Sequence, residues 1–141
     1  MITIVDKIKA SIHAATDLPV YYDSEEMLNK MLDYGGLPCA YFALLQDGSL
    51  ERNNGVFRER VNVAIFFVNK TNFEPDAEEN EQIIQDCKEA AYRWLAALRI
   101  DQFFTLDGSV STQRVYEQND VILTGFAVRV SLTEKQGYCN G

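Results

Sequence analysis

The chain has 141 residues, 47% of them hydrophobic, which is enough for one domain with a substantial core. Its 13 Lys and Arg against 21 Asp and Glu give a net charge of −8, which argues against non-specific nucleic-acid binding because phosphate contacts need basic side chains. The longest apolar run, residues 63–68, is too short to span a membrane, and charges near the N-terminus interrupt any signal-peptide core, so the sequence predicts a cytoplasmic protein.

The first part of the chain is expected to form two short helices and then a pair of strands. Apolar residues at helical spacing predict a helix over 1–15, and a capping pattern predicts a second helix over 23–34. A short extended segment at 20–22 separates them. Residues 39–69 are typical of a strand–loop–strand unit, in which 46–57 is either a mobile loop or a pair of short hairpin arms.

The strand at 58–69 and the helix after it carry the clearest burial patterns. Apolar side chains occupy both faces of the strand near its end, which predicts a central position in the sheet. A long helix is predicted over 76–99, with a stripe suited to burial against a sheet. The stripe consists of Ile83, Ile84, Cys87, Ala91, Trp94, Leu95 and Leu98.

Residues 102–132 are predicted to form strands, followed by a polar tail at 133–141. A short strand at 102–106 turns at 107–109 into a polar strand at 111–117 that suits a sheet edge or an interface. The last strand, 121–132, alternates between two faces. One face carries Ile122, Phe126, Val128, Val130 and Leu132, and the other carries Leu123, Gly125, Ala127, Arg129 and Ser131.

These elements predict a single α+β domain over 1–141. Its sheet is expected to have four to five strands, mostly antiparallel or mixed, packed by the long helix, with two shorter N-terminal helices. One face of the sheet is expected to pack on a helical core, and the thinner opposite face is available for another covering element.

No pattern in the chain predicts catalysis. The single histidine, His13, lies in a helix without a motif partner, so a structural role is expected. Acidic residues at 23–26 and 74–81 have the positions of helix starts rather than of metal ligands. Cys87 is expected in the core, and Cys39, Cys87 and Cys139 have the spacing of neither a disulfide framework nor a zinc site. The sequence therefore predicts no enzyme, no cofactor and no metal.

Arg52, Arg58 and Arg60 form the only basic concentration, around the 46–57 segment. They are either a solvated entry to the strand or a contact patch for an acidic partner, such as the acidic face of a neighbouring copy.

The order of elements resembles that of small bacterial prophage proteins of the tail-terminator or tail-completion type, which sit at the head–tail junction. The resemblance extends over nearly the whole chain as a pattern rather than as a signature motif. It is carried by Leu18-Pro19-Val20-Tyr21-Tyr22, by the hairpin around 46–57, by Ala90-Ala91-Tyr92-Arg93-Trp94-Leu95, and by Gly125 to Leu132 with the Gly137-Tyr138-Cys139 ending.

This resemblance implies a non-enzymatic ring, commonly a hexamer, that caps the tail tube and joins it to the neck proteins. It implies a location in the host cytoplasm during assembly and then in the virion, with no cofactor, no specific nucleic-acid binding and no membrane. The candidate interface comprises the 46–57 segment, strand 111–117 and the thin face of the last strand. Its residues are Arg52, Arg58, Arg60, Gln113, Tyr116 and Arg129.

Two other classes of function stay open. A small binding module or dimeric adaptor would be favoured by a large apolar pocket between helix and sheet. A small enzyme would be favoured if Glu59, Glu117 or Asp120 met Arg58 or Arg60 in one deep cleft.

Overall fold

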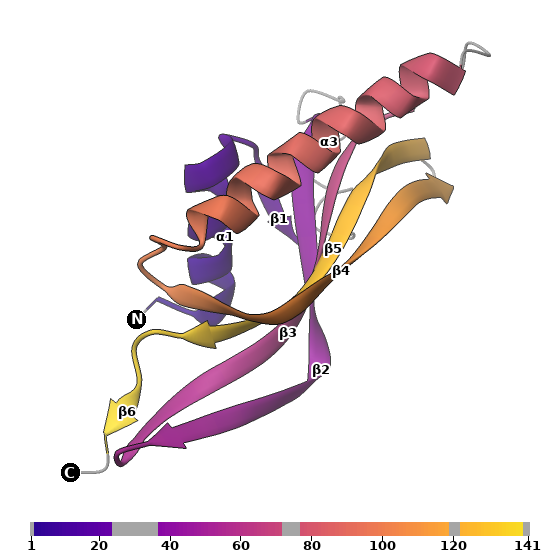
Figure 1. The fold of residues 1–141 in the computed structure, drawn as a ribbon. Coiled ribbons are helices and arrows are strands. Elements are labelled where there is room, and N and C mark those ends of the chain that lie inside the picture. Colours follow the sequence, from indigo (N-terminus) through magenta and orange to yellow (C-terminus); the bar gives the residue numbers. More distant parts are fainter. Residues whose placement is uncertain (1, 24–36, 72–76, 119–121, 140–141) are drawn as a thin grey trace.

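The computed structural model describes residues 2–23, 37–71, 77–118 and 122–139, and in these ranges two helices lie on one face of a mixed β-sheet (Figure 1). The α+β class expected from the sequence is confirmed. The helices are α1 (Ile4–Thr16) and α3 (Ala77–Ala97). The strands are β1 (Val20–Tyr22), β2 (Cys39–Asn53), β3 (Val56–Lys70), β4 (Phe104–Gln118), β5 (Ile122–Glu134) and β6 (Tyr138–Cys139).

The sheet has the strand order β1-β2-β3-β5-β4, with β6 pairing to β3 off this path. β1 is parallel to β2 and the other pairs are antiparallel, so the mixed alternative is correct. The prediction that residues 133–141 form only a polar tail is partly wrong. β5 continues to Glu134, and β6 adds a sixth strand beyond the expected four or five, because the chain after β5 returns to the edge of β3 and pairs its backbone groups there.

One local prediction in the strands is corrected, and one choice between two alternatives is decided. The expected separate strands at 102–106 and 111–117 form one strand, β4, and the expected turn at 107–109 is a register shift between Asp107 and Ser111. Gly108 has φ +66 within this bulge, a conformation that glycine adopts without steric cost. Of the two alternatives for 46–57, the hairpin arms are correct and the loop is wrong, since β2 and β3 continue through the segment to Asn53 and Val56, with a register shift between Leu44 and Gly48.

The helices begin and end close to the predicted residues. Thr3 and Asp6 form a capping box at the start of α1, in which the Thr3 hydroxyl accepts from the Asp6 N–H at 3.2 Å. α3 covers most of the predicted 76–99, and Ile84, Cys87 and Trp94 of its stripe are buried as expected. The predicted helix 23–34 lies outside the described residues.

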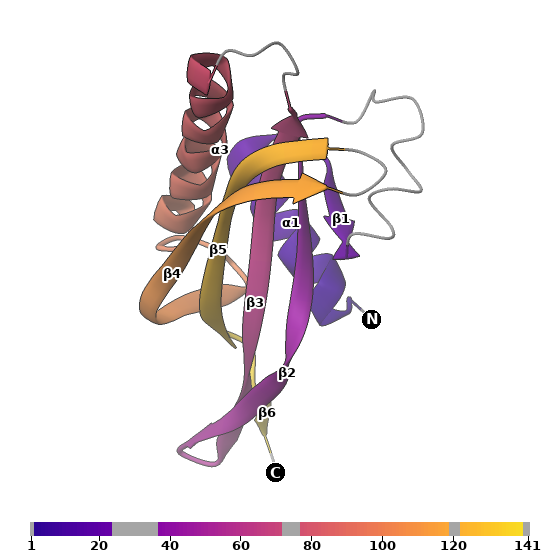
Figure 2. The same cartoon turned by 90° about the vertical axis from the view of Figure 1, so that its right-hand side faces the viewer.

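The main core fills the space between the helices and the sheet. β3 is central, between β2 and β5, and its Val63, Ile65 and Phe67 are fully buried under the helices (Figure 2). At the end of β5, the buried carboxylate of Glu134 accepts from Lys7 Nζ of α1 at 3.3 Å.

The other face of the sheet, which α1 and α3 do not cover, is called the far face below. The alternation predicted for the last strand is correct, since Phe126 and Val128 join the main core while Leu123 and Ala127 join a smaller apolar cluster on the far face. Tyr41 and Phe66 stack there with ring centroids 4.8 Å apart.

Candidate functional site

A hairpin arm, residues 45–57, extends beyond the two-layer body. β2 and β3 remain paired to its end, where the two-residue turn Asn54-Gly55 has φ values of 53° and 78°. Positive φ at both turn positions is typical of the tight turn that matches the twist of a hairpin. Residues 45–55 are all exposed, and both views show the arm pointing away from the helices (Figures 1 and 2). The arm is therefore a built projection rather than an irregular loop.

The C-terminal residues hold the base of this arm to the body. Lys135 donates its N–H to the Phe103 carbonyl at 2.8 Å, and its own carbonyl accepts from Arg58 Nε at 3.2 Å. β6 then pairs with Val56 and Phe57 near the tip. These bonds connect the start of β4 with the arm, so its direction is fixed by more than its own two strands.

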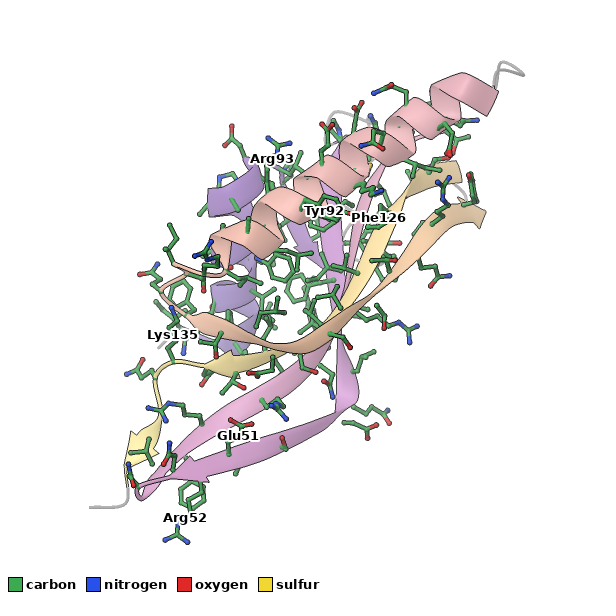
Figure 3. All side chains as sticks on the ribbon, viewed as in Figure 1. Glu51, Arg52, Tyr92, Arg93, Phe126 and Lys135 are labelled. Atoms are coloured by element: carbon green, nitrogen blue, oxygen red, sulfur yellow. The ribbon has the colours of Figure 1, made fainter. Side chains whose placement is uncertain are left out.

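The three arginines of the predicted basic patch have different roles. Arg60 forms ion pairs with Glu51 at 2.9 Å and with Asp107 at 3.4 Å, and thereby links β2, β3 and β4 on the far face. Arg58 bonds Lys135, as described above. The guanidinium of Arg52, at the arm (Figure 3), lies 5.6 Å from the centroid of the Phe57 ring and makes no ion pair with the described residues. Of the three, Arg52 is the one most available to a partner.

Gln113 and Arg129 come together in an open depression of about 320 Å³ on the far face. Its remaining lining residues are Ala64, Phe66, Ser111, Thr112 and Ala127. Arg129 is exposed and makes no ion pair within the part of the chain that the structure describes. The structure does not bring Tyr116 to this place, because strand alternation puts Tyr116 on the face opposite to Gln113.

A groove of about 350 Å³ between α3 and β4 was not predicted from the sequence. Tyr92 of α3 and Phe126 of β5 both line it (Figure 3). Lys88 Nζ lies 5.6 Å from the centroid of the Tyr92 ring. Arg114 of β4 pairs with Glu81 of α3, and this hydrogen bond lowers the pKa of the Glu81 carboxyl. The sequence signal for the groove was the position of Tyr92, an aromatic residue outside the apolar stripe of its helix.

The adaptor alternative requires a large apolar pocket between helix and sheet, and the lining of this groove is mostly polar. Six of its nine lining residues are polar or charged: Glu81, Gln85, Lys88, Thr112, Gln113 and Arg114. A third cavity, of about 150 Å³, is lined in part by Cys39 and Cys87. Burial raises the pKa of each of these thiols to about 12, so they are poor nucleophiles.

The enzyme alternative needed a carboxylate and an arginine in one deep cleft, and the described residues do not provide this arrangement. Glu59 is exposed and alternates to the face opposite to Arg58 and Arg60, while Asp120 and the side chain of Glu117 lie outside the described residues. His13 is exposed, with Nδ1 2.9 Å from the Leu18 carbonyl oxygen, which fits the structural role expected for it. Among the described residues, no group of three or more His, Cys, Asp or Glu side chains is placed to hold a metal ion.

Comparison of the sequence with models of known families and with curated proteins finds no match. Neither described helix has the length and apolar character needed to cross a membrane.

Proposed function

We propose that the chain is a non-enzymatic structural subunit that assembles into a ring, as phage tail terminators do at the head–tail junction. The observation that carries this proposal is the hairpin arm. A two-stranded projection with exposed side chains contributes little to the core of its own domain, and it costs conformational entropy to order. Such a feature suits a subunit whose arm is stabilised by contact with a neighbouring copy.

The open edge of the arm supports the same proposal. Among the described strands, only β1 pairs with the outer side of β2, and it does so at residues 40–42, before the arm begins. Unpaired strand edges attract other chains, and monomeric proteins protect them with charged side chains (especially Lys), Pro, β-bulges or a covering element. A register shift interrupts the ladder between Leu44 and Gly48, and residues 48–53 beyond it are paired to β3 and contain neither Lys nor Pro.

The acidic charge suits a ring through which DNA passes. With a net charge of −8, a lumen lined by this chain would repel phosphates and let the duplex move without binding. In this proposal the partners are further copies of the chain, the tail tube and the neck proteins, first in the host cytoplasm and then in the virion.

The test is the solution mass measured by light scattering over a concentration series, with negative-stain electron microscopy of the same samples. We expect closed rings, or monomers that form rings as the concentration rises or when tail tubes are added. A tight dimer whose mass does not change with concentration would contradict the ring and favour the adaptor alternative. Tight DNA binding at physiological salt would contradict the non-binding lumen.

A further inference from the structure

Two hollows on opposite faces of the sheet meet at the edge strand β4. The α3–β4 groove lies on the helix side, and the depression that holds Arg129, called the far-face depression below, lies on the other side. Thr112 and Gln113 each line both hollows. Their side chains nevertheless point to opposite faces, as those of their partners in β5 do. Both hollows therefore reach the backbone of β4 at this point of the strand.

The backbone of β4 is open along its outer edge. β4 is the last strand of the sheet path, and among the described strands only β5 pairs with it (Figure 1). Residues 111–118 contain no Pro, so each of them retains its N–H group. Arg114, the cation of this stretch, is bound to Glu81 of α3. Within the described structure, the N–H and C=O groups on the outer side of this stretch are thus open to a further strand.

An extended peptide fits this edge better than a small molecule or a helix does. A strand added to β4 would lie about 4.8 Å beyond it, and its successive side chains would point to opposite faces of the sheet. One set of side chains would enter the α3–β4 groove and the other set would enter the far-face depression. A small molecule or a helix would occupy one hollow and leave the backbone groups of the edge unpaired.

The charged groups in the two hollows favour acidic side chains in that peptide. The charged residues that line the hollows are Glu81, Lys88, Arg114 and Arg129. Glu81 and Arg114 compensate each other in their ion pair. Lys88 and Arg129 make no ion pair with the described residues. Each hollow therefore holds one cation without a counter-charge of its own, although the whole chain has a net charge of −8.

The side chains of an added strand are long enough to reach both cations. Lys88 lines the groove directly beside β4. Arg129 lies on β5, roughly 10 Å or two strand spacings from the added strand. An arginine and a glutamate side chain that extend toward each other span this distance. Because neighbouring residues of a strand point to opposite faces, the two carboxylates must come from positions an odd number of residues apart.

We propose that the outer edge of β4 binds an extended acidic segment of another protein by strand addition, with one carboxylate at Lys88 and a second at Arg129. The backbone supplies affinity, and the two hollows supply specificity for the alternate side chains. This binding site goes beyond the ring described under the proposed function and does not depend on it.

A library of random dodecapeptides displayed on yeast tests the proposal. We expect the enriched peptides to carry Asp or Glu at positions an odd number of residues apart, among β-branched and aromatic residues. With the most enriched peptide made synthetically, Lys88→Gln and Arg129→Gln should each weaken binding about fivefold. Arg99→Gln removes the same charge at an exposed position that lines neither hollow, and it should leave binding unchanged. Circular dichroism verifies that each variant is folded.

Methylation of the peptide backbone distinguishes strand addition from attraction between charges alone. In an added strand, only alternate N–H groups point toward β4. Peptides in which one or the other alternate set of backbone nitrogens is methylated should therefore differ at least about tenfold in Kd. Hydrogen exchange at residues 111–118 should also become slower when the unmethylated peptide binds, while exchange in the arm at 48–53 stays the same.

Each outcome either supports the acidic strand or overturns it. A selection that enriches no peptide, or enriches peptides without acidic residues, would overturn the proposal. Equal binding of the two methylated peptides would overturn strand addition. Loss of peptide binding as the chain assembles with itself would show that a second copy occupies this edge instead. Rings that bind no peptide would overturn this site alone, and peptide binding by a chain that forms no ring would overturn the proposed function alone.

Discussion

The indole of Trp94 in α3 donates a hydrogen bond from Nε1 to the hydroxyl oxygen of Ser11 in α1 at 2.9 Å, and both side chains are buried. This is a polar connection between the two described helices inside an otherwise apolar core. The serine gives the buried N–H an acceptor that no apolar residue at position 11 would supply.

Replacing Ser11 by Ala should therefore destabilise the protein. The indole N–H would lose its acceptor while remaining buried, which costs about 1–3 kcal/mol in the free energy of unfolding. Urea unfolding followed by Trp94 fluorescence measures this cost, with Ser109→Ala at an exposed serine as the control. A loss no greater than that of the control would show that the bond contributes nothing.

Gly125→Ala should have a larger effect. A Cβ atom at Gly125 would lie 2.0 Å from the Phe67 carbonyl oxygen in the neighbouring central strand, where the backbone cannot move aside. We expect a cost at or above the upper end of about 1–3 kcal/mol for overpacking, or failure to fold. Gly108→Asn is the matched variant, since a Cβ at Gly108 has no atom within 4 Å and Asn tolerates its positive φ. Similar melting temperatures for the two variants would contradict this reading.

Gly137→Ala should detach β6 from the arm without unfolding the domain. Its Cβ would lie 2.3 Å from Val56 Cγ1 and 2.9 Å from the Phe57 carbonyl oxygen. Hydrogen exchange should become faster at 56–57 and 138–139, while the buried amides of β3 keep their protection. Gln136→Ala, at an exposed position, provides the control. Unchanged exchange at 56–57 would mean that β6 does not brace the arm.

The buried cysteines predict a dependence on pH. Because the pKa values of Cys39 and Cys87 are about 12, only about one thiol in ten thousand is ionised at pH 8 in the folded protein. Iodoacetamide should leave both unmodified until urea unfolds the chain, in a Cys139→Ser background. The unfolded thiols ionise near their ordinary pKa of 9.0, so stability should fall as the pH rises from about 9 towards 12. Rapid modification of the folded protein at pH 8 would show that the thiols are accessible.

The sequence by itself determined the elements in which one periodicity dominates. The stripe of α3 and the alternation of β5 depend only on which side chains avoid water, and both are correct in the structure. The central position of β3 followed in the same way, from apolar side chains on both of its faces.

Only the tertiary structure decided how polar segments pair. β6 forms by backbone hydrogen bonds to Val56 and Phe57, which are distant from it in the sequence, and no pattern within residues 138–139 specifies that partner. The α3–β4 groove likewise depends on how far α3 lies from an edge strand that begins after it in the chain. Periodicity within a segment carries no information about such distances, so the sequence did not show that Arg60 pairs within its own chain or that Tyr92 lines a groove.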